Sequence, residues 1–322
     1  MKTDYDALLL VSFGGPEGMD DVIPFLENVL RGRNVPRERM LSVARHYELF
    51  GGVSPINQQN RNLIAALEKE FEQHGPPLPI YWGNRNWYPL LPDTLRQMAA
   101  DGIQNALAFV TSGYSSYSSC RQYLQNISDA QAAVGPGAPR VEKLRVFYKH
   151  PLFIEANVDH IRAALKQLED STAAHLVFTA HSIPESMAAN CDYASQLAHT
   201  GALIARELEN KKWHLVYQSR SGSPAQPWLG PDVCDHLRAL RDEGVTNVVI
   251  APIGFISDHM EIIYDLDVLA RQVADEIGMK MVRASTAGTH PSFVKMIREL
   301  VMERVNDEAP VNICAPDCCL VS

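Results

Sequence analysis

Short apolar runs alternate along this chain with amphipathic stretches. The runs 106–110, 176–178 and 248–251 carry almost no polar side chains, which is typical of strands buried on both faces of a parallel sheet. Between such runs, 60–72 and 194–209 place apolar residues at helical spacing. The alternation predicts an α/β protein built from βα units wound into open parallel sheets.

The order of these segments repeats once. The segment 10–17 is similar to 178–185, 63–65 recurs as 203–205, and 101–105 is similar to 243–247. Three matches in the same order predict a duplicated domain, and 322 residues suit two domains. We expect an N-terminal lobe over 1–140, a C-terminal lobe over 141–290, a helix over 291–308 that packs back on the first lobe, and a cysteine-containing tail over 309–322.

The first half carries an insertion at about 20–51. The distance from Pro16 to Leu63 exceeds that from Pro184 to Leu203 by about 28 residues. The insertion mixes basic residues with apolar ones, so it could cover a ligand at the end of the sheet or form a surface helical hairpin. Because ligands of open α/β sheets bind at the carboxyl ends of strands, the repeat predicts that Phe13 and His181 face one cleft.

Residues able to do chemistry follow two strands of the second half. His181 comes at the end of a strand, where a neutral imidazole can bind a metal or accept a proton; the alternative is a structural histidine. The segment 257–261 holds Asp258, His259 and Glu261, and Asp265 lies one turn further on. These acidic residues either complement a helix N-terminus or handle a cation or protons.

The corresponding place in the first half, 114–123, is rich in Tyr and Ser and contains no carboxylate. Aromatic rings and hydroxyls suit a flat apolar ligand with polar edges, although a serine-rich helix cap would have the same composition. Gly-rich phosphate-binding motifs are missing from the sequence, so nucleotide binding is unsupported.

Composition excludes several classes of protein. The formal net charge of −9 argues against a nucleic-acid partner. We expect no transmembrane segment, because no apolar run approaches the ~18 residues that a span requires. Residues 1–6 do not have the pattern of a signal peptide, so we expect a cytoplasmic protein. Six cysteines are too few for a disulfide framework.

At this point the sequence resembles the ferrochelatases over nearly its whole length. Six ordered blocks carry the resemblance, at 8–16, 51–56, 180–184, 218–220, 227–231 and 257–261. The sequence of 116–123 is most similar to that of the actinobacterial branch of the family, whose members generally act on coproporphyrin III.

The resemblance implies two Rossmann-like chelatase domains around a porphyrin cleft, and a lyase that inserts Fe²⁺ into a porphyrin in haem biosynthesis. His181 and Glu261 would hold the Fe²⁺ substrate. A proton or metal path would use Asp258, His259 and Asp265. Contacts with the porphyrin are implied for Phe13, Arg31, His46, Ser54 and Tyr123. Other enzymes of haem biosynthesis are the implied partners.

Three positions depart from the family pattern. Phe13 stands where the Gram-positive coproporphyrin enzymes often have a tyrosine able to ligate iron, which a phenyl ring cannot do. Leu30 replaces a basic residue that is common in that group, with Arg31 beside it. His46 stands where arginine is usual. The residue that would ligate the iron of the product, and the residues that would bind the propionates, therefore differ from the family pattern.

The last nine residues contain three cysteines in a Cys-x₃-Cys-Cys arrangement. Some ferrochelatases hold a [2Fe–2S] cluster with three C-terminal cysteines and one internal cysteine, and the resemblance assigns these ligands to Cys314, Cys318, Cys319 and Cys120. Free thiols or a zinc site are the alternatives.

Other activities remain open on sequence grounds. They are a ferrochelatase acting on protoporphyrin IX, a haem- or porphyrin-binding carrier on the same scaffold, and a cobalt or nickel chelatase of tetrapyrroles.

Overall fold

The computed structural model describes residues 5–32, 35–221, 225–308 and 318–319. These residues form two compact units. Unit 1 contains the described residues up to 111 together with 122–145 and 297–308, and unit 2 contains 112–121, 146–296 and 318–319. Residues 112–121, which the sequence predicts in the first lobe, thus belong to unit 2.

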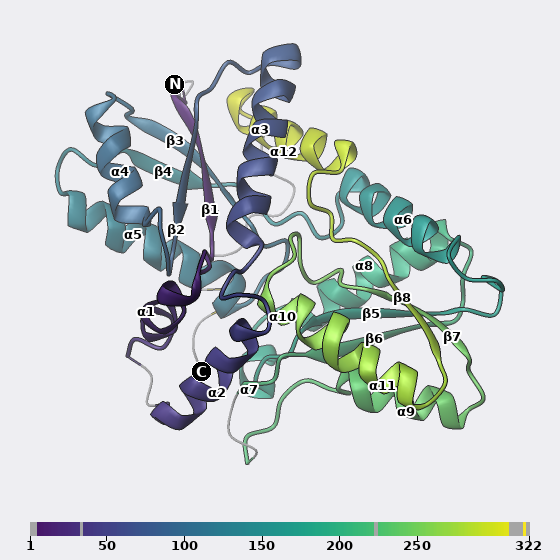
Figure 1. Cartoon of the computed structure of the whole chain (residues 1–322). Helices are drawn as coiled ribbons and strands as arrows, with labels where there is room; N and C mark the ends of the chain where they lie inside the picture. The colour runs from purple at the N-terminus through teal and green to yellow at the C-terminus, as the bar shows by residue number, and fades with distance from the viewer. Residues whose placement is uncertain (1–4, 33–34, 222–224, 309–317, 320–322) are drawn as a thin grey trace. The chain divides into compact units, whose positions relative to one another are not determined.

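Each unit is built on a four-stranded parallel sheet (Figure 1). Unit 1 has the strand order β2-β1-β3-β4 and unit 2 the order β6-β5-β7-β8. Because the two orders are equivalent, the topology agrees with the duplication inferred from the sequence, and the predicted α/β class is confirmed. The strands are β1 (Ala7–Ser12), β2 (Ile80–Asn84), β3 (Asn105–Val110), β4 (Arg140–Lys143), β5 (His175–His181), β6 (Trp213–Gln218), β7 (Asn247–Ala251) and β8 (Lys280–Arg283).

In unit 1, α4 and α5 cover one face of the sheet and α3 lies on the opposite side (Figure 1). The shared core is apolar because β1 and β3 alternate residues toward α4 and α5, for example Leu9 and Ala108 against Leu95 and Ile127. The helices are α1 (Met19–Val29), α2 (Arg37–Glu48), α3 (Ile56–His74), α4 (Leu91–Ala100) and α5 (Gln122–Val134).

In unit 2, the helices α9 and α11 pack on one face of the sheet, against Val177 and Ile250. On the other face lie α6 and α8 (Figure 1). The helices and helical turns are η1 (Tyr117–Arg121), α6 (Pro151–Leu165), α7 (Glu185–Ala188), α8 (Tyr193–Glu207), α9 (Val233–Asp242), α10 (Met260–Ile263), η2 (Asp265–Ala270) and α11 (Arg271–Glu276), while α12 (Pro291–Val305) contributes to both units. η1 and η2 are π-helical turns.

The insertion of the first half forms α1 and α2. Each buries one apolar side, with Val22, Phe25 and Leu26 on α1 and Met40 and Tyr47 on α2. The chain returns through Gly52, whose φ of +78° is in the left-handed region and whose added Cβ would lie 2.4 Å from the backbone nitrogen of Met19. Only glycine fits there without strain, so this residue fixes where the insertion rejoins α3.

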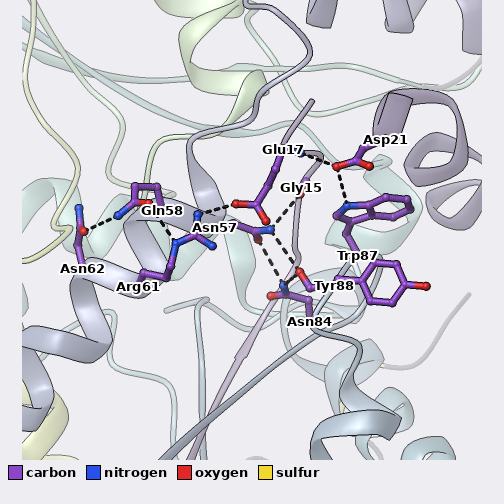
Figure 2. Close-up of polar contacts among 10 residues, drawn as sticks. All are labelled: Gly15, Glu17, Asp21, Asn57, Gln58, Arg61, Asn62, Asn84, Trp87 and Tyr88. Atoms are coloured by element: carbon purple, nitrogen blue, oxygen red, sulfur yellow. Dashed lines mark hydrogen bonds and ion pairs between the residues drawn. The ribbon is translucent and has the colours of Figure 1, made fainter. Parts of the chain in front are cut away.

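A polar network holds the loop that follows β1 (Figure 2). Asn57 and Asn84 are completely buried. The Asn57 amide donates to the carbonyl oxygens of Gly15 at 3.1 Å and Tyr88 at 3.3 Å, and Asn84 donates to Asn57 Oδ1 at 3.3 Å. These buried amides satisfy loop carbonyls that no strand or helix can reach, and so they fix the loop in which Phe13 lies.

Among the helices formed by the described residues, none is both long and apolar enough for a membrane span.

Candidate active site

His181 and Glu261 come together at the carboxyl ends of neighbouring strands. His181 is the last residue of β5, and Glu261 lies in α10, which follows β7. β5 and β7 are hydrogen-bonded neighbours in the sheet. The His181 Nε2 atom lies 3.3 Å from Oε1 of Glu261. The two residues proposed to hold the metal thus form one ion pair at the edge where open α/β sheets bind ligands.

The orientation of the His181 ring is fixed by backbone contacts. Its Nδ1 atom makes a short hydrogen bond with the carbonyl oxygen of Ser182. A carbonyl can only accept, so Nδ1 carries a hydrogen and Nε2 faces Glu261. The Tyr193 hydroxyl donates to the His181 carbonyl at 3.0 Å, which holds the end of β5. Nε2 is therefore the atom available to a metal or a proton.

Opposite charges dominate the protonation of this pair. Burial alone would lower the pKa of His181, but the charge and hydrogen bond of Glu261, with the Ser182 carbonyl, raise it to about 9. Burial would raise the pKa of Glu261, yet the His181 charge lowers it to about 2. Since the Glu261 side chain is 48% exposed, solvent screens the pair, and it contributes about 1 kcal/mol or less to the free energy of unfolding. The pair therefore adds little stability, and its importance is that it places two possible metal ligands side by side.

His259 approaches the same carboxylate from the other side. It caps α10, where its Nδ1 accepts a hydrogen bond from the Glu261 backbone N–H at 3.2 Å. Its Nε2 lies 4.0 Å from Glu261 Oε2. Burial, reinforced by the charge of His181, lowers the pKa of His259. One carboxylate thus sits between a protonated ring and a neutral one at pH 7.

Asp265 begins η2 and accepts a short hydrogen bond from the Ser219 hydroxyl. Burial and the neighbouring charge of Glu261 raise the pKa of Asp265 to about 7, although the Ser219 hydrogen bond opposes the shift. A carboxyl group with this pKa can take up and release protons at neutral pH. The structure therefore places His259, Glu261 and Asp265 in one acidic cluster with His181.

Asp258 is held by a residue that sequence reasoning missed. The guanidinium of Arg283 lies 2.6 Å (Nε) and 2.9 Å (Nη2) from the two Asp267 oxygens, and 3.2 Å (Nη1) and 3.4 Å (Nη2) from those of Asp258. Its side chain is only 15% exposed. Such two-fold pairing fixes the loop before α10 relative to η2. No motif signals Arg283, because an arginine at a strand end is common.

In unit 1, a second missed residue joins two of those proposed to contact porphyrin. The Arg85 guanidinium lies 4.5 Å from the centre of the Tyr123 ring and 5.6 Å from that of Phe13. Its Nε donates to Asn126 at 2.7 Å. Phe13 also packs edge-on against Phe25 at 6.2 Å. Arg85 therefore places a cation between two aromatic rings, next to the strand end that carries Phe13.

The other proposed porphyrin contacts lie elsewhere in unit 1. Ser54 is buried against Gly15, whose added Cβ would lie 2.7 Å from the Ser54 Cβ. Arg31 is exposed just after α1 and donates to Asn28. His46 is half-buried on α2, and burial together with the Arg45 charge lowers its pKa. These three belong to the insertion or to its junction with α3.

Of the proposed cluster ligands, Cys120 in η1 is 3% exposed and Cys319 is 5% exposed. Cys318 is half-buried, and Cys314 lies outside the described residues. Within the described part of the chain, no three His, Cys, Asp or Glu side chains form a ready-made metal-binding group. The His181–Glu261 pair is thus a two-residue site rather than a closed cage.

We predict that Glu261→Gln lowers the pKa of His181 from about 9 to near or below 6.5. The substitution removes the carboxylate charge, while the burial that disfavours the imidazolium remains. In the wild-type protein the ring is protonated until the pH rises through about 9, and in the variant it becomes neutral near pH 7. Titration of the His181 ring by NMR measures this change. Glu207→Gln, an equal change of charge on the surface of unit 2, should leave the pKa unaltered. A pKa that stays near 9 in Glu261→Gln would contradict this explanation of the shift.

Comparisons with known proteins identify the family of the whole chain. The family model described as ferrochelatase matches residues 5–305. The chain is 57% identical to a ferrochelatase of Rhodopirellula baltica, over 98% of this chain and 93% of that protein. It is 48% identical to the coproporphyrin III ferrochelatase of Streptomyces coelicolor, over 98% and 93%.

The fold is also similar to that of a solved structure, the sirohydrochlorin chelatase SirB from Bacillus subtilis subspecies spizizenii in complex with cobalt. The TM-score is 0.58 at 11% identity, covering 95% of this chain and 97% of that one. This likeness shows the chelatase fold alone. Sequence, sheet topology and the family match lead to the same conclusion: the chain belongs to the ferrochelatase family.

Proposed function

We propose that this chain is a ferrochelatase that inserts Fe²⁺ into coproporphyrin III in haem biosynthesis. The observation that carries the proposal is the His181–Glu261 pair, 3.3 Å apart at a strand end of a ferrochelatase-family chain. Support for the porphyrin comes from relatives about 50% identical over nearly the whole chain, which are coproporphyrin III ferrochelatases.

The pair suits the chemistry of metal insertion. Fe²⁺ brings two positive charges next to His181, which lowers the pKa of the ring and displaces its Nε2 proton. Nε2 and the Glu261 carboxylate are then free to bind the metal as nitrogen and oxygen ligands. Once the metal has passed to the porphyrin, the neutral Nε2 can accept a pyrrole proton.

Two protons leave the porphyrin for each Fe²⁺ that enters. His181 accounts for one of them. Asp265, with a pKa raised by burial to about 7, can take up the second and release it to solvent. The hydrogen bond from Ser219 holds this carboxyl group in place. We propose Asp265, together with His259 and Asp258, as the path along which protons leave.

Coproporphyrin III carries four propionates and protoporphyrin IX carries two, so substrate choice depends on cations that can pair with carboxylates. We propose Arg31 on the insertion for this task, because it is exposed and matches carboxylate geometry. His46, whose pKa is lowered by burial, is proposed to donate a hydrogen bond to a propionate as a neutral ring. Phe13, Tyr123 and Ser54 are proposed to contact the macrocycle. Phe13 offers no ligand to the iron of the product.

We further propose a [2Fe–2S] cluster on Cys120, Cys314, Cys318 and Cys319. Four thiolates are the set of ligands that such a cluster needs, and two of the described cysteines are almost fully buried, as a shielded cluster requires. The proposal depends on this donor set and on the Cys-x₃-Cys-Cys spacing. We also propose the cytoplasm as the location, since six cysteines are too few for a disulfide framework and suit a reducing compartment. Other enzymes of haem biosynthesis are the proposed partners.

The first test is a pair of anaerobic assays with Fe²⁺, one on coproporphyrin III and one on protoporphyrin IX. We expect loss of porphyrin fluorescence and growth of metalloporphyrin absorbance, at least tenfold faster with coproporphyrin III. Faster turnover of protoporphyrin IX would overturn the choice of substrate. Tight binding of both porphyrins without turnover would indicate a carrier.

A second prediction concerns His181. His181→Ala should reduce the insertion rate by about 10²- to 10⁴-fold, the usual loss on removing a catalytic acid or base, while porphyrin binding measured by fluorescence quenching stays within twofold. His199→Ala, which removes an exposed histidine of α8, is the control and should behave as wild type. Retained turnover in His181→Ala would remove it from the reaction.

The cluster has its own test. Cys314→Ser in anaerobically purified protein should abolish the visible absorbance and the iron and sulfide content expected of a [2Fe–2S] protein. Cys234→Ser, on α9 and outside the proposed ligand set, should retain both. An unchanged spectrum in Cys314→Ser would remove this cysteine from the ligands, and bound zinc in place of iron would favour the alternative site.

A further inference from the structure

Gln218 contacts both chain segments that carry the His181–Glu261 pair. It is the last residue of β6 and lies directly opposite His181 in the parallel register of β5 and β6. Its carbonyl oxygen accepts the Ser182 N–H at 2.8 Å. Its side-chain Nε2 donates to the backbone carbonyl of Glu261 at 2.6 Å. One residue thus ties the strand end of His181 to the helix of Glu261.

The Glu261 carbonyl needs such a donor because of where it lies. α10 is a single turn, Met260–Ile263, and the π-helical turn η2 begins at Asp265. Where the hydrogen-bonding period of a helix changes from four residues to five, carbonyls near the junction lose the regular pattern. A one-turn helix also cannot hold its own orientation by internal hydrogen bonds. The position of Glu261 is therefore set from outside the helix.

The Gln218 side chain is held in one orientation by its surroundings. The residue is 1% exposed. Rotating the amide by half a turn would place its oxygen against the Glu261 carbonyl, two acceptors facing each other, so the amide orientation is fixed. In the orientation adopted, Oε1 is buried without a hydrogen-bond partner among the described residues. A buried acceptor left unsatisfied is costly, which points to a constraint other than stability.

The next residue supports this interpretation independently. Ser219 has a φ of +62°, in the left-handed region that residues other than glycine rarely adopt. In this conformation its hydroxyl reaches the Asp265 carboxylate. The end of β6 therefore holds the acidic segment at two points, Glu261 in α10 and Asp265 in η2, and it accepts backbone strain to do so.

We infer that Gln218 is a positioning residue that sets the separation between His181 Nε2 and the Glu261 carboxylate, and thereby the affinity of the enzyme for ferrous iron. The inference rests on the proposed function of that pair. It assigns Gln218 no contact with either substrate: the residue acts only through the backbone of Ser182 and of Glu261.

The test uses Gln218→Met, which keeps the length of the side chain and removes the donor. We expect the KM for Fe²⁺ to rise by about 10- to 100-fold, the usual range for a residue that orients a metal ligand, while the Kd for coproporphyrin III, measured by fluorescence, changes less than twofold. Direct titration of the protein with Co²⁺ in the absence of porphyrin should show the same loss of affinity.

Gln196→Met is the matched control. Gln196 is another buried glutamine of unit 2, and it bonds to Ser115 instead of the acidic segment. Its loss should lower the thermal midpoint to a similar extent and leave the KM for Fe²⁺ unchanged. If Gln218→Met does not fold, Gln218→Glu serves the same purpose, because it keeps the shape and turns a carboxylate oxygen toward the Glu261 carbonyl.

The outcomes separate the role of Gln218 from the proposed function. An unchanged KM for Fe²⁺ in the Gln218 variants, or equal losses of iron and porphyrin affinity, would overturn the assignment of Gln218. An equal rise of the KM for Fe²⁺ in Gln196→Met would do the same, since the effect would then be one of general stability. Failure of the wild-type protein to metallate either porphyrin would instead overturn the proposed function.

Discussion

The 3.3 Å contact between His181 and Glu261 is the constraint that the loops at the carboxyl edge of the unit 2 sheet must satisfy. His181 ends β5, whereas Glu261 lies in α10 after the neighbouring strand β7, so the chain after β7 must turn back over the end of β5. Gly254 makes this turn possible. Its N–H donates to the Thr179 carbonyl at 3.0 Å, and an added Cβ would lie 2.5 Å from the Ala180 Cβ. A side chain at this position would lift the loop off the strand and move Glu261 away from His181.

The two halves of the sequence share one topology but carry different side chains at equivalent places. After the third strand of each half comes a π-helical turn, η1 after β3 and η2 after β7. Turns of this kind re-aim side chains and occur often at functional sites. In the second half the turn and the residues before it hold carboxylates and a histidine, whereas the first half has tyrosine, serine and Cys120. At the ends of the equivalent first strands, Phe13 corresponds to His181. The second copy therefore carries the groups proposed to handle metal and protons, and the first carries the groups proposed to contact the macrocycle.

Sequence patterns predict the parts of this protein that depend on local periodicity. The buried strands 106–110 and 248–251 lie within β3 and β7, and the helical stretch 60–72 lies within α3. The repeat predicts two equivalent sheets, as observed. Strand ends then locate His181, and the acidic segment that follows β7 locates Glu261.

What the patterns do not predict is the choice of polar partners. Arg283 and Arg85 are ordinary residues at ordinary spacings, and Gln218 lies in the block 218–220 without any sign of which groups it bonds. The contacts of all three arise from neighbours far away in the sequence. Asn57 and Asn84 are polar residues that hydropathy alone assigns to the surface, yet both are completely buried because loop carbonyls need donors. The placement of 112–121 in unit 2 likewise depends on tertiary contacts, such as the one between Ser115 and Gln196.

The two histidines beside Glu261 explain why the position of this carboxylate must be controlled so closely. Both rings are partly buried, with the His181 side chain 29% and the His259 side chain 21% exposed, and both lie near the same negative charge. Yet the pKa of His181 rises and that of His259 falls. The difference follows from distance and hydrogen bonding: His181 Nε2 is 3.3 Å from the carboxylate, whereas His259 Nε2 is 4.0 Å away and its Nδ1 is already bonded to the Glu261 N–H. Once His181 is charged, its repulsion disfavours a second proton on His259. At neutral pH one of the two rings is therefore charged and the other is neutral, and the Fe²⁺ proposed to bind here would displace the extra proton. A small shift of Glu261 toward His259 would make the protonation of the two rings more alike, so the groups that fix the Glu261 backbone control which ring carries the charge.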